Sequence, residues 1–76
     1  MKPLTKRQTE VLDFIKHQMI NHGLPPTRVE IAEHFDFKSA NAAEDHVKAL
    51  EAKGHIRVLK GISRGIQVVS WESKAA

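Results

Sequence analysis

Residues 27–50 read TRVEIAEHFDFKSANAAEDHVKAL, and this stretch decides the fold. It holds two short helical patterns separated by a tight link, Asp36-Phe37-Lys38. Thr27, followed by a glutamate three residues later, has the spacing of a capping box and predicts the start of the first helix. The second helix begins with a cap at either Ser39 or Asn41, since both residue types accept hydrogen bonds from a first helical turn. Two short helices joined this tightly are typical of a helix-turn-helix, whose second helix lies in the DNA major groove.

A longer helix is expected before this stretch, over residues 6–22. Thr5 and Gln8 form another capping-box pattern at its start, and Gly23 is a natural C-terminal stop. The dipeptide Pro25-Pro26 excludes a helix and predicts an extended turn. At 100° per residue one face of the long helix is apolar, and we expect that face in the core; it consists of Val11, Leu12, Phe14, Ile15 and Met19.

After Gly54 the apolar period changes from helical spacing to alternation. Two short alternating runs, over residues 55–59 and 66–69, are separated by a glycine-containing turn at 60–65, which predicts a β-hairpin. The predicted fold is therefore mainly α with a small β-hairpin, a winged helix-turn-helix of three helices and a two-stranded wing. We expect this domain to span residues 1–70, with residues 71–76 as a tail or the start of a linker.

Composition excludes several classes of function. The 76 residues carry a formal net charge of +3, which weakly favours polyanions such as nucleic acid. Cysteine is absent, so disulfides and thiolate metal sites are excluded, and the five histidines include no pair at the i, i+4 spacing. We expect no metal, no cofactor and no small-molecule ligand.

No apolar run approaches the roughly 20 residues that span a bilayer, so we expect a cytoplasmic protein. No combination of a nucleophile, a base and an orienting group stands out, so we expect that the protein is not an enzyme.

The second helix of the motif has a polar side whose groups match base edges. Asn41, Glu44, Asp45 and Lys48 fall within an arc of roughly 100° on a helical projection. Asparagine can pair bidentately with adenine, a carboxylate can accept from the cytosine amino group, and the small Ala42 can lie against a thymine methyl. Because this arc holds no arginine, we expect a half-site with cytosine, thymine and adenine edges. The alternative interpretation is a solvated face whose asparagine and glutamate only cap the helix.

Carboxylates on this face repel phosphates, so nearby cations must offset them. Thr27 and Arg28 open the first helix of the motif, where backbone N–H groups and the helix dipole favour a phosphate. In the wing, Ser63 and Arg64 are candidates for a phosphate or minor-groove contact, the alternative for Arg64 being a solvated turn cation. The full set of candidates for such contacts is Arg7, Thr27, Arg28, Lys38, His46, Lys48, Lys53, Ser63 and Arg64.

Four segments of the chain resemble one family at matching spacings. They read LTKRQTEVLDFIK, GLPPTRVEIAEHF, FKSANAAEDHVKALEAKGHI and GISRGI, and they cover most of residues 1–69. On these segments the chain resembles the N-terminal DNA-binding domain of the LexA repressors, which control the bacterial SOS response. The resemblance implies a winged helix that occupies palindromic operators with CTGT-type half-sites. It maps wing contacts onto the region of Ser63 and Arg64, and base contacts onto Ser39, Asn41, Ala42, Glu44 and Asp45.

The chain departs from the family pattern in three residues and in length. Ala40 replaces a usual proline, Asp45 a usual glutamate, and Ile62 a small wing residue, and the shorter Asp45 could shift or relax the preference at one base. The family continues into a self-cleaving Ser-Lys peptidase domain that also dimerises. We therefore expect double-stranded DNA binding without self-cleavage, and a homodimer on palindromic DNA only with a dimerisation domain. The alternative is a winged-helix module that binds proteins, such as a short antagonist of a full-length repressor.

Overall fold

The computed structural model describes residues 3–62 and 64–69. In this part of the chain, three helices are followed by two strands that form one antiparallel hairpin. This arrangement confirms the predicted fold of three helices with a two-stranded wing. The predicted tail, 71–76, lies outside the described residues. The elements are α1 Lys6–His22, α2 Arg28–Phe35, α3 Ala40–Ala52, β1 Ile56–Val58 and β2 Ile66–Val68.

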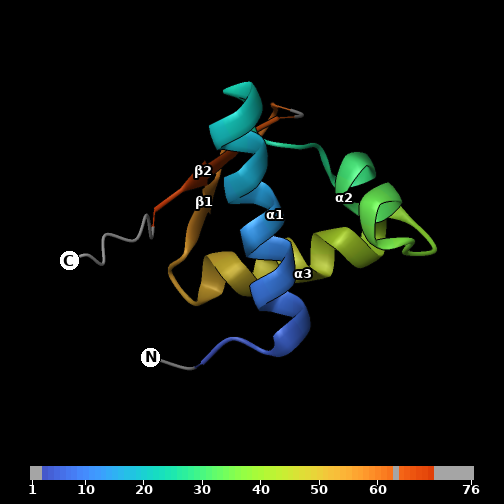
Figure 1. The fold of residues 1–76 in the computed structure, drawn as a ribbon. Coiled ribbons are helices and arrows are strands. Elements are labelled where there is room, and N and C mark those ends of the chain that lie inside the picture. The colour runs from blue at the N-terminus through green and yellow to red at the C-terminus, as the bar shows by residue number, and fades with distance from the viewer. Residues whose placement is uncertain (1–2, 63, 70–76) are drawn as a thin grey trace.

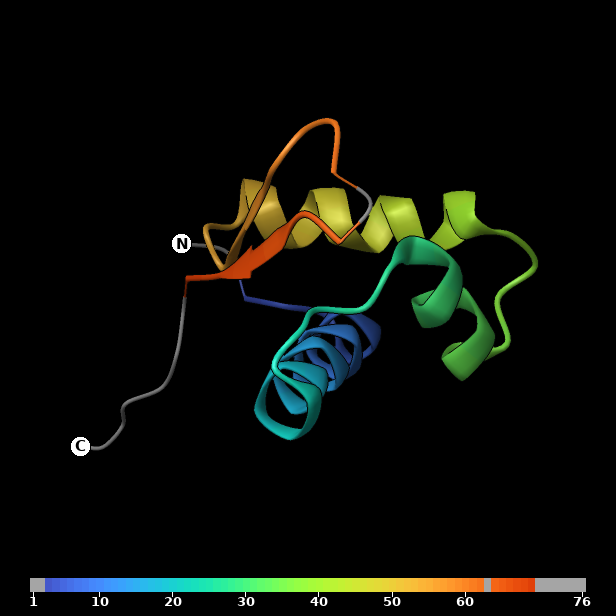
Figure 2. The same cartoon turned by 90° about the horizontal axis from the view of Figure 1, so that it is seen from above.

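The crossing of α1 and α3 organises the other elements (Figure 1). Figure 2, turned by 90°, shows α2 near the N-terminal end of α3 and the hairpin beside the C-terminal half of α3. The tip of the hairpin reaches back toward the segment that precedes α2 (Figure 1). The third helix therefore crosses α1, with α2 near its N-terminal end and the hairpin beside its C-terminal half.

The first two helices begin at the predicted capping boxes. The Thr5 hydroxyl accepts a hydrogen bond from the Gln8 backbone N–H at 3.1 Å, and the Gln8 side chain accepts from the Thr5 N–H. Thr27 and Glu30 repeat this reciprocal pair at the start of α2, also at 3.1 Å. α1 ends where predicted, because Gly23 adopts a left-handed conformation with a φ of 75° that glycine accepts without strain.

The third helix begins without a side-chain cap. Its N-cap residue is Ser39, whose hydroxyl makes no capping hydrogen bond, and the helix itself starts at Ala40. Asn41 is therefore already inside the helix, which decides between the two predicted caps in favour of Ser39. The reciprocal pair of Asn41 with Glu44 does not form, and the Glu44 carboxylate instead binds Arg28 of α2.

The link between α2 and α3 is held by its backbone and by an aromatic ring. Asp36 ends α2 in the left-handed region with a φ of 59°, which asparagine and aspartate tolerate better than most residues. The Phe37 N–H donates to the Ala32 carbonyl oxygen at 2.8 Å. The Phe37 ring stacks between those of Phe35 and His46, with centroid separations of 5.5 and 5.2 Å. Phe37 therefore packs against the core.

The core is built from the predicted apolar faces. In α1 the buried residues come from the expected face, while Ile20, which lies off that face, is 69% exposed. In α3 the residues opposite the polar arc are fully buried. The buried apolar residues are Val11, Leu12, Ile15, Ile31, Ala32, Ala43, Val47, Leu50, Ile56, Ile66 and Val68.

The hairpin pairs Ile56 with Val68 and Val58 with Ile66, so that Ile56, Ile66 and Val68 join the core. Its turn closes tightly at Gly65, whose carbonyl oxygen accepts from the Leu59 N–H at 2.7 Å. A Cβ atom at this position would collide with the backbone oxygen of Leu59. The close approach of two backbone segments therefore explains the glycine.

An ion pair joins the wing to α2. The Arg64 guanidinium donates to both carboxylate oxygens of Glu30 at 2.7 Å, and also to the Pro25 carbonyl oxygen at 2.9 Å. These hydrogen bonds from Arg64, with a second contribution from the Thr27 N–H, lower the pKa of Glu30 from 4.5 to about 2. A bidentate guanidinium–carboxylate pair fixes direction as well as distance, so the wing has a defined position relative to α2.

Truncation of the core side of α3 should destabilise the domain strongly. Leu50 is fully buried, and Leu50→Ala should lower the free energy of unfolding by about 2–5 kcal/mol, because it removes packing and leaves a cavity. Ile20→Ala, at a position 69% exposed, should change the same quantity by less than about 0.5 kcal/mol. Urea unfolding followed by circular dichroism measures both. Similar costs at the two positions would contradict the assignment of the core.

The Glu30–Arg64 pair should make stability depend on pH at acid pH. The pKa of Glu30 is lower in the folded chain, so its stabilisation is present above the ordinary value of 4.5 and is lost as the pH falls toward about 2. Glu30→Gln keeps an acceptor for the Thr27 N–H but removes the charge. Urea midpoints of this variant should therefore fall less than those of the wild type between these pH values. Parallel acid profiles for the two chains would argue against the pair.

Candidate nucleic-acid interface

One side of α3 presents a row of polar side chains to solvent. Asn41, Asp45 and Lys48 are exposed, as is Ser39 at the N-cap position, while Ala43, Val47 and Leu50 on the opposite side are fully buried. The predicted polar side of the helix is thus exposed, and the opposite side faces the core. The half-buried Ala42 lies on one flank of the exposed row, and Glu44 lies on the other.

The polar groups of this row are not used to build the fold. Within the described part of the chain, the side chains of Ser39, Asn41 and Asp45 make no hydrogen bond or ion pair. The helix start does not need Ser39 or Asn41, since neither caps it. Their hydrogen-bonding capacity is therefore available to an external partner.

Glu44 differs from its neighbours because it has an internal partner. The Arg28 Nε donates to the Glu44 Oε1 at 2.6 Å, which joins the first residue of α2 to the middle of α3. The two side chains are 19% and 34% exposed, so this is the least exposed of the ion pairs among the described residues. The structure thus pairs Arg28, which was predicted to contact a phosphate, with Glu44, which was predicted to contact a base.

Three other predicted DNA contacts also have internal partners. Arg7 pairs with Glu10 at 3.1 Å, and its guanidinium carbon lies 5.5 Å from the centroid of the Phe35 ring. The Lys53 ammonium donates to the Gln8 Oε1 at 2.6 Å and to the Pro3 carbonyl oxygen at 3.0 Å. Arg64 holds Glu30, as described above. Because these cations already have partners within the chain, a contact with phosphate would require an exchange of partners.

The remaining residues predicted to contact phosphate or the minor groove differ in how far the fold already uses them. Lys38 and Lys48 are exposed; Lys38 precedes α3 and Lys48 lies on its exposed polar side. Thr27 uses its hydroxyl as a cap, and the His46 ring stacks on Phe37, so both are partly committed to the fold. Ser63 lies outside the described residues.

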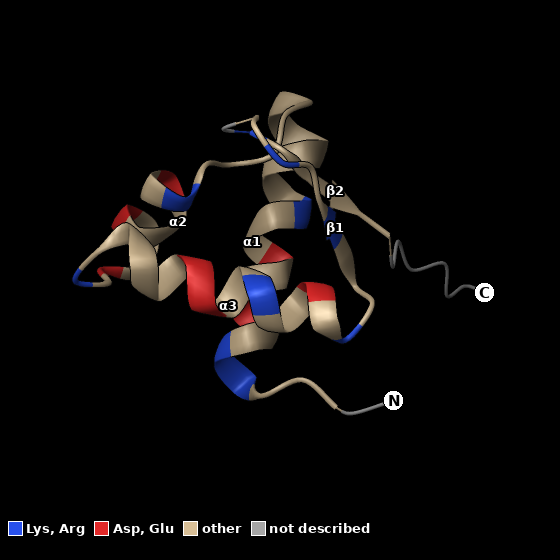
Figure 3. Ribbon diagram, turned by 180° about the vertical axis from the view of Figure 1, so that it is seen from behind, with Lys and Arg blue, Asp and Glu red and all other residues tan. Residues whose placement is uncertain are grey.

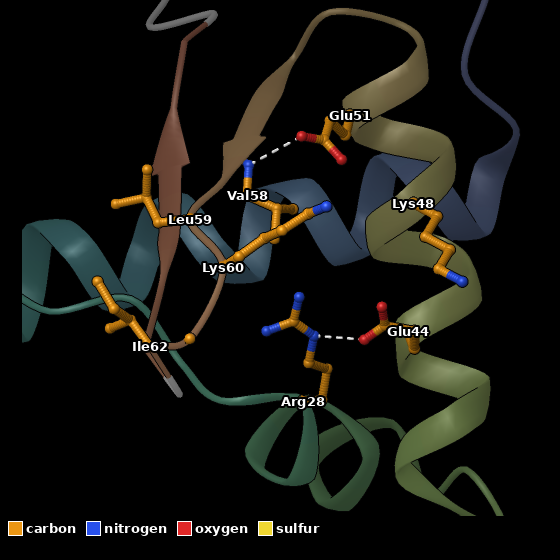
Figure 4. Close-up of a pocket in the computed structure, with 9 residues that line it drawn as sticks. Arg28, Glu44, Lys48, Glu51, Val58, Leu59, Lys60 and Ile62 are labelled. Atoms are coloured by element: carbon orange, nitrogen blue, oxygen red, sulfur yellow. Dashed lines mark hydrogen bonds and ion pairs between the residues drawn. The ribbon is translucent and has the colours of Figure 1, made fainter.

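Charges of both signs alternate along α3 (Figure 3), as expected from Glu44 and Asp45 next to Lys48. A groove separates this helix from the wing (Figure 4). Its lining includes Arg28, Glu44 and Lys48 together with Lys60 of the wing turn. Sequence reasoning missed Lys60, although its place at the first position of the turn was a usable signal.

Glu51 was also not predicted to have a role. Its Oε2 accepts a hydrogen bond from the Val58 N–H at 3.1 Å across the groove (Figure 4). Glu44 and Glu51 are two helical turns apart and lie on the same side of α3. One ties the helix to α2 and the other ties it to the wing, so this flank of α3 has a fixed position.

The described residues contain no cluster of three or more histidine, cysteine, aspartate or glutamate side chains that could hold a metal ion. None of the described helices has the length and apolar character needed to cross a membrane.

Comparison with known proteins agrees with the geometry. The family model of the LexA DNA binding domain matches residues 1–65. The chain is 62% identical over 68 residues to the LexA repressor of Pseudoalteromonas atlantica, a match that covers 90% of this chain and 33% of that protein. It is 57% identical over 74 residues to the LexA repressor of Aeromonas hydrophila, covering 97% of this chain and 36% of the relative.

The LexA repressor of Shewanella frigidimarina is 57% identical over 72 residues, which are 95% of this chain and 35% of that protein. The chain thus spans about a third of the length of the curated relatives it matches. The family match extends from α1 through the wing turn and includes the exposed polar side of α3. The chain belongs to the LexA DNA-binding domain family.

Proposed function

We propose that this chain binds double-stranded DNA in a sequence-specific manner, as the DNA-binding part of a LexA-type transcriptional repressor. One observation carries the proposal: the exposed side of α3 holds polar groups that the fold does not use, while its other side is fully buried. An α-helix fits the major groove, and its exposed side chains can then reach base edges.

The residues proposed to read bases are Ser39, Asn41, Ala42, Glu44 and Asp45. Asn41 is suited to adenine, which takes a bidentate amide, and the two carboxylates are suited to the cytosine amino group. Ala42 is small enough to contact a thymine methyl group. These preferences support a half-site of the CTGT type within a palindromic operator.

Phosphate contacts are proposed for cations around the reading side. Lys38 and Lys48 are exposed and need no rearrangement, while Lys60 adds a charge from the wing across the groove. Arg7, Lys53 and Arg64 contribute positive potential from their paired positions and reach phosphate by exchanging partners. Because such contacts release counterions, affinity should fall steeply with salt.

The proposed biological role is repression of SOS-type genes by occupation of their operators in the bacterial cytoplasm. One domain covers one half-site, and two copies on a palindrome follow its two-fold symmetry. A linked dimer would gain affinity through effective concentration, which an isolated domain lacks. We therefore expect the 76-residue chain to bind a single half-site weakly.

The test is binding to a duplex with a CTGT-type palindrome and to a scrambled duplex of equal composition, at several salt concentrations. Tighter binding to the palindrome, with a linear loss of log affinity against log salt, is expected. Equal affinity for both duplexes would rule out specific recognition. Absence of any shift at low salt, together with recovery of the chain in complex with a full-length repressor, would favour a protein-interaction module.

Asn41→Ala and Lys38→Gln should separate base reading from phosphate binding. Loss of the Asn41 amide should cost about 1–3 kcal/mol of discrimination at an adenine position and leave binding to scrambled DNA nearly unchanged. Loss of the Lys38 charge should weaken all duplexes alike and reduce the salt slope by about 1. Fluorescence anisotropy on duplexes substituted one base pair at a time measures both effects. A uniform loss for Asn41→Ala would show that this side chain does not read a base.

A further inference from the structure

We propose that Arg28 is a positioning residue for Glu44, and that it determines base preference through this carboxylate instead of gripping a phosphate itself. The proposal rests on the proposed function, because it assigns Glu44 to a base. Arg28 is the first residue of α2, where sequence alone favoured a phosphate contact. The structure instead directs its side chain across the groove to α3 (Figure 4).

The first support is burial. The Arg28 side chain is 19% exposed, compared with 50% for Arg7 and 41% for Arg64. A guanidinium at this depth is poorly placed to receive a phosphate from solvent. Moving it outward would also leave the Glu44 carboxylate without its cation, and an ion pair broken in a partly desolvated place is costly. Of the three arginines in ion pairs among the described residues, Arg28 is therefore the least suited to partner exchange.

The second support is the geometry of the pair. One nitrogen of Arg28, Nε, binds one oxygen of Glu44, Oε1, at 2.6 Å. This charge-assisted hydrogen bond restrains the position of the carboxylate at one of its two oxygens. Within the described residues the other oxygen, Oε2, accepts no hydrogen bond, so it remains available to an amino group on a base edge. A glutamate fixed before DNA arrives loses less conformational freedom on binding than a mobile one.

The third support is charge. A lone carboxylate in the major groove is repelled by the flanking phosphates, but the Arg28–Glu44 pair has no net charge. Glu44 can thus offer an acceptor at a smaller electrostatic cost. Asp45, one residue further along α3, has no cation partner in the described part of the chain. The contribution of Glu44 to specificity should therefore depend on Arg28, while that of Asp45 should not.

The experiment is a double-mutant cycle read out as base discrimination. Arg28→Gln, Glu44→Gln and the double variant are titrated against the palindromic duplex and duplexes substituted at each base pair of the half-site. The position at which Glu44→Gln loses discrimination, by about tenfold, defines the Glu44 base pair. Arg28→Gln should lose about the same factor at that position alone, and the double variant should lose no more than either single variant.

Asp45→Asn provides the matched control. Asp45→Asn should lower discrimination at the base pair that Asp45 reads. The loss at that base pair should be the same whether or not Arg28→Gln is also present. The opposite result would be an Arg28→Gln substitution that weakens binding to every duplex equally and lowers the salt slope by about 1. If the slope falls in this way both in the otherwise wild-type chain and in the Glu44→Gln variant, Arg28 contacts a phosphate and the proposal is overturned.

Arg28→Lys covers the case in which Arg28→Gln does not fold, as judged by circular dichroism. Lysine keeps the positive charge but lacks the planar fork, so discrimination at the Glu44 base pair should still fall. Unchanged discrimination in Arg28→Lys would show that charge alone suffices and would reject orientation by the guanidinium. A wild-type chain that binds all duplexes alike would instead overturn the proposed function, a result that this cycle distinguishes from a failure of Arg28 alone.

Discussion

The rotation of α3 about its own axis is the constraint on which the rest of the molecule depends. Ala43, Val47 and Leu50 are fully buried, and they lie on one side of a helix whose opposite side is polar. A rotation of about 100° in one sense would replace them by Glu44, Lys48 and Glu51, and an unpaired charge in the core is strongly unfavourable. The same packing that stabilises the domain therefore decides which side chains remain available for recognition.

Local sequence patterns predicted most of the fold because the responsible interactions are local. The capping boxes at Thr5 and Thr27 each join residues three apart, and the change to alternation after Gly54 reflects the strand period. The left-handed conformation of Asp36 at the end of α2 was not predicted, because helices that end in this way usually do so at glycine or asparagine. The Phe37 ring that follows Asp36 packs against the core.

The site was predicted as a set of residue types on one helix face, but not as a network. Arg28 and Glu44 are 16 residues apart in the chain, and Arg64 and Glu30 are 34 apart. Spacing alone cannot pair such residues, since each partner depends on how two elements pack. The sequence therefore predicted which α3 side chains face outward, but it did not predict that Arg28 and Arg64 bind carboxylates within the chain.

These two ion pairs meet in the first turn of α2. Arg28 extends from that turn to α3, and Glu30, two residues later, receives Arg64 from the wing. Thr27 caps the same turn and shares Glu30 with Arg64, because the Glu30 Oε1 accepts from both. A helix-turn-helix needs its first helix to place the second, and here the start of α2 also places the wing. Since α3 and the wing are both paired to this one turn, a change in its capping should alter the relative position of both elements at once.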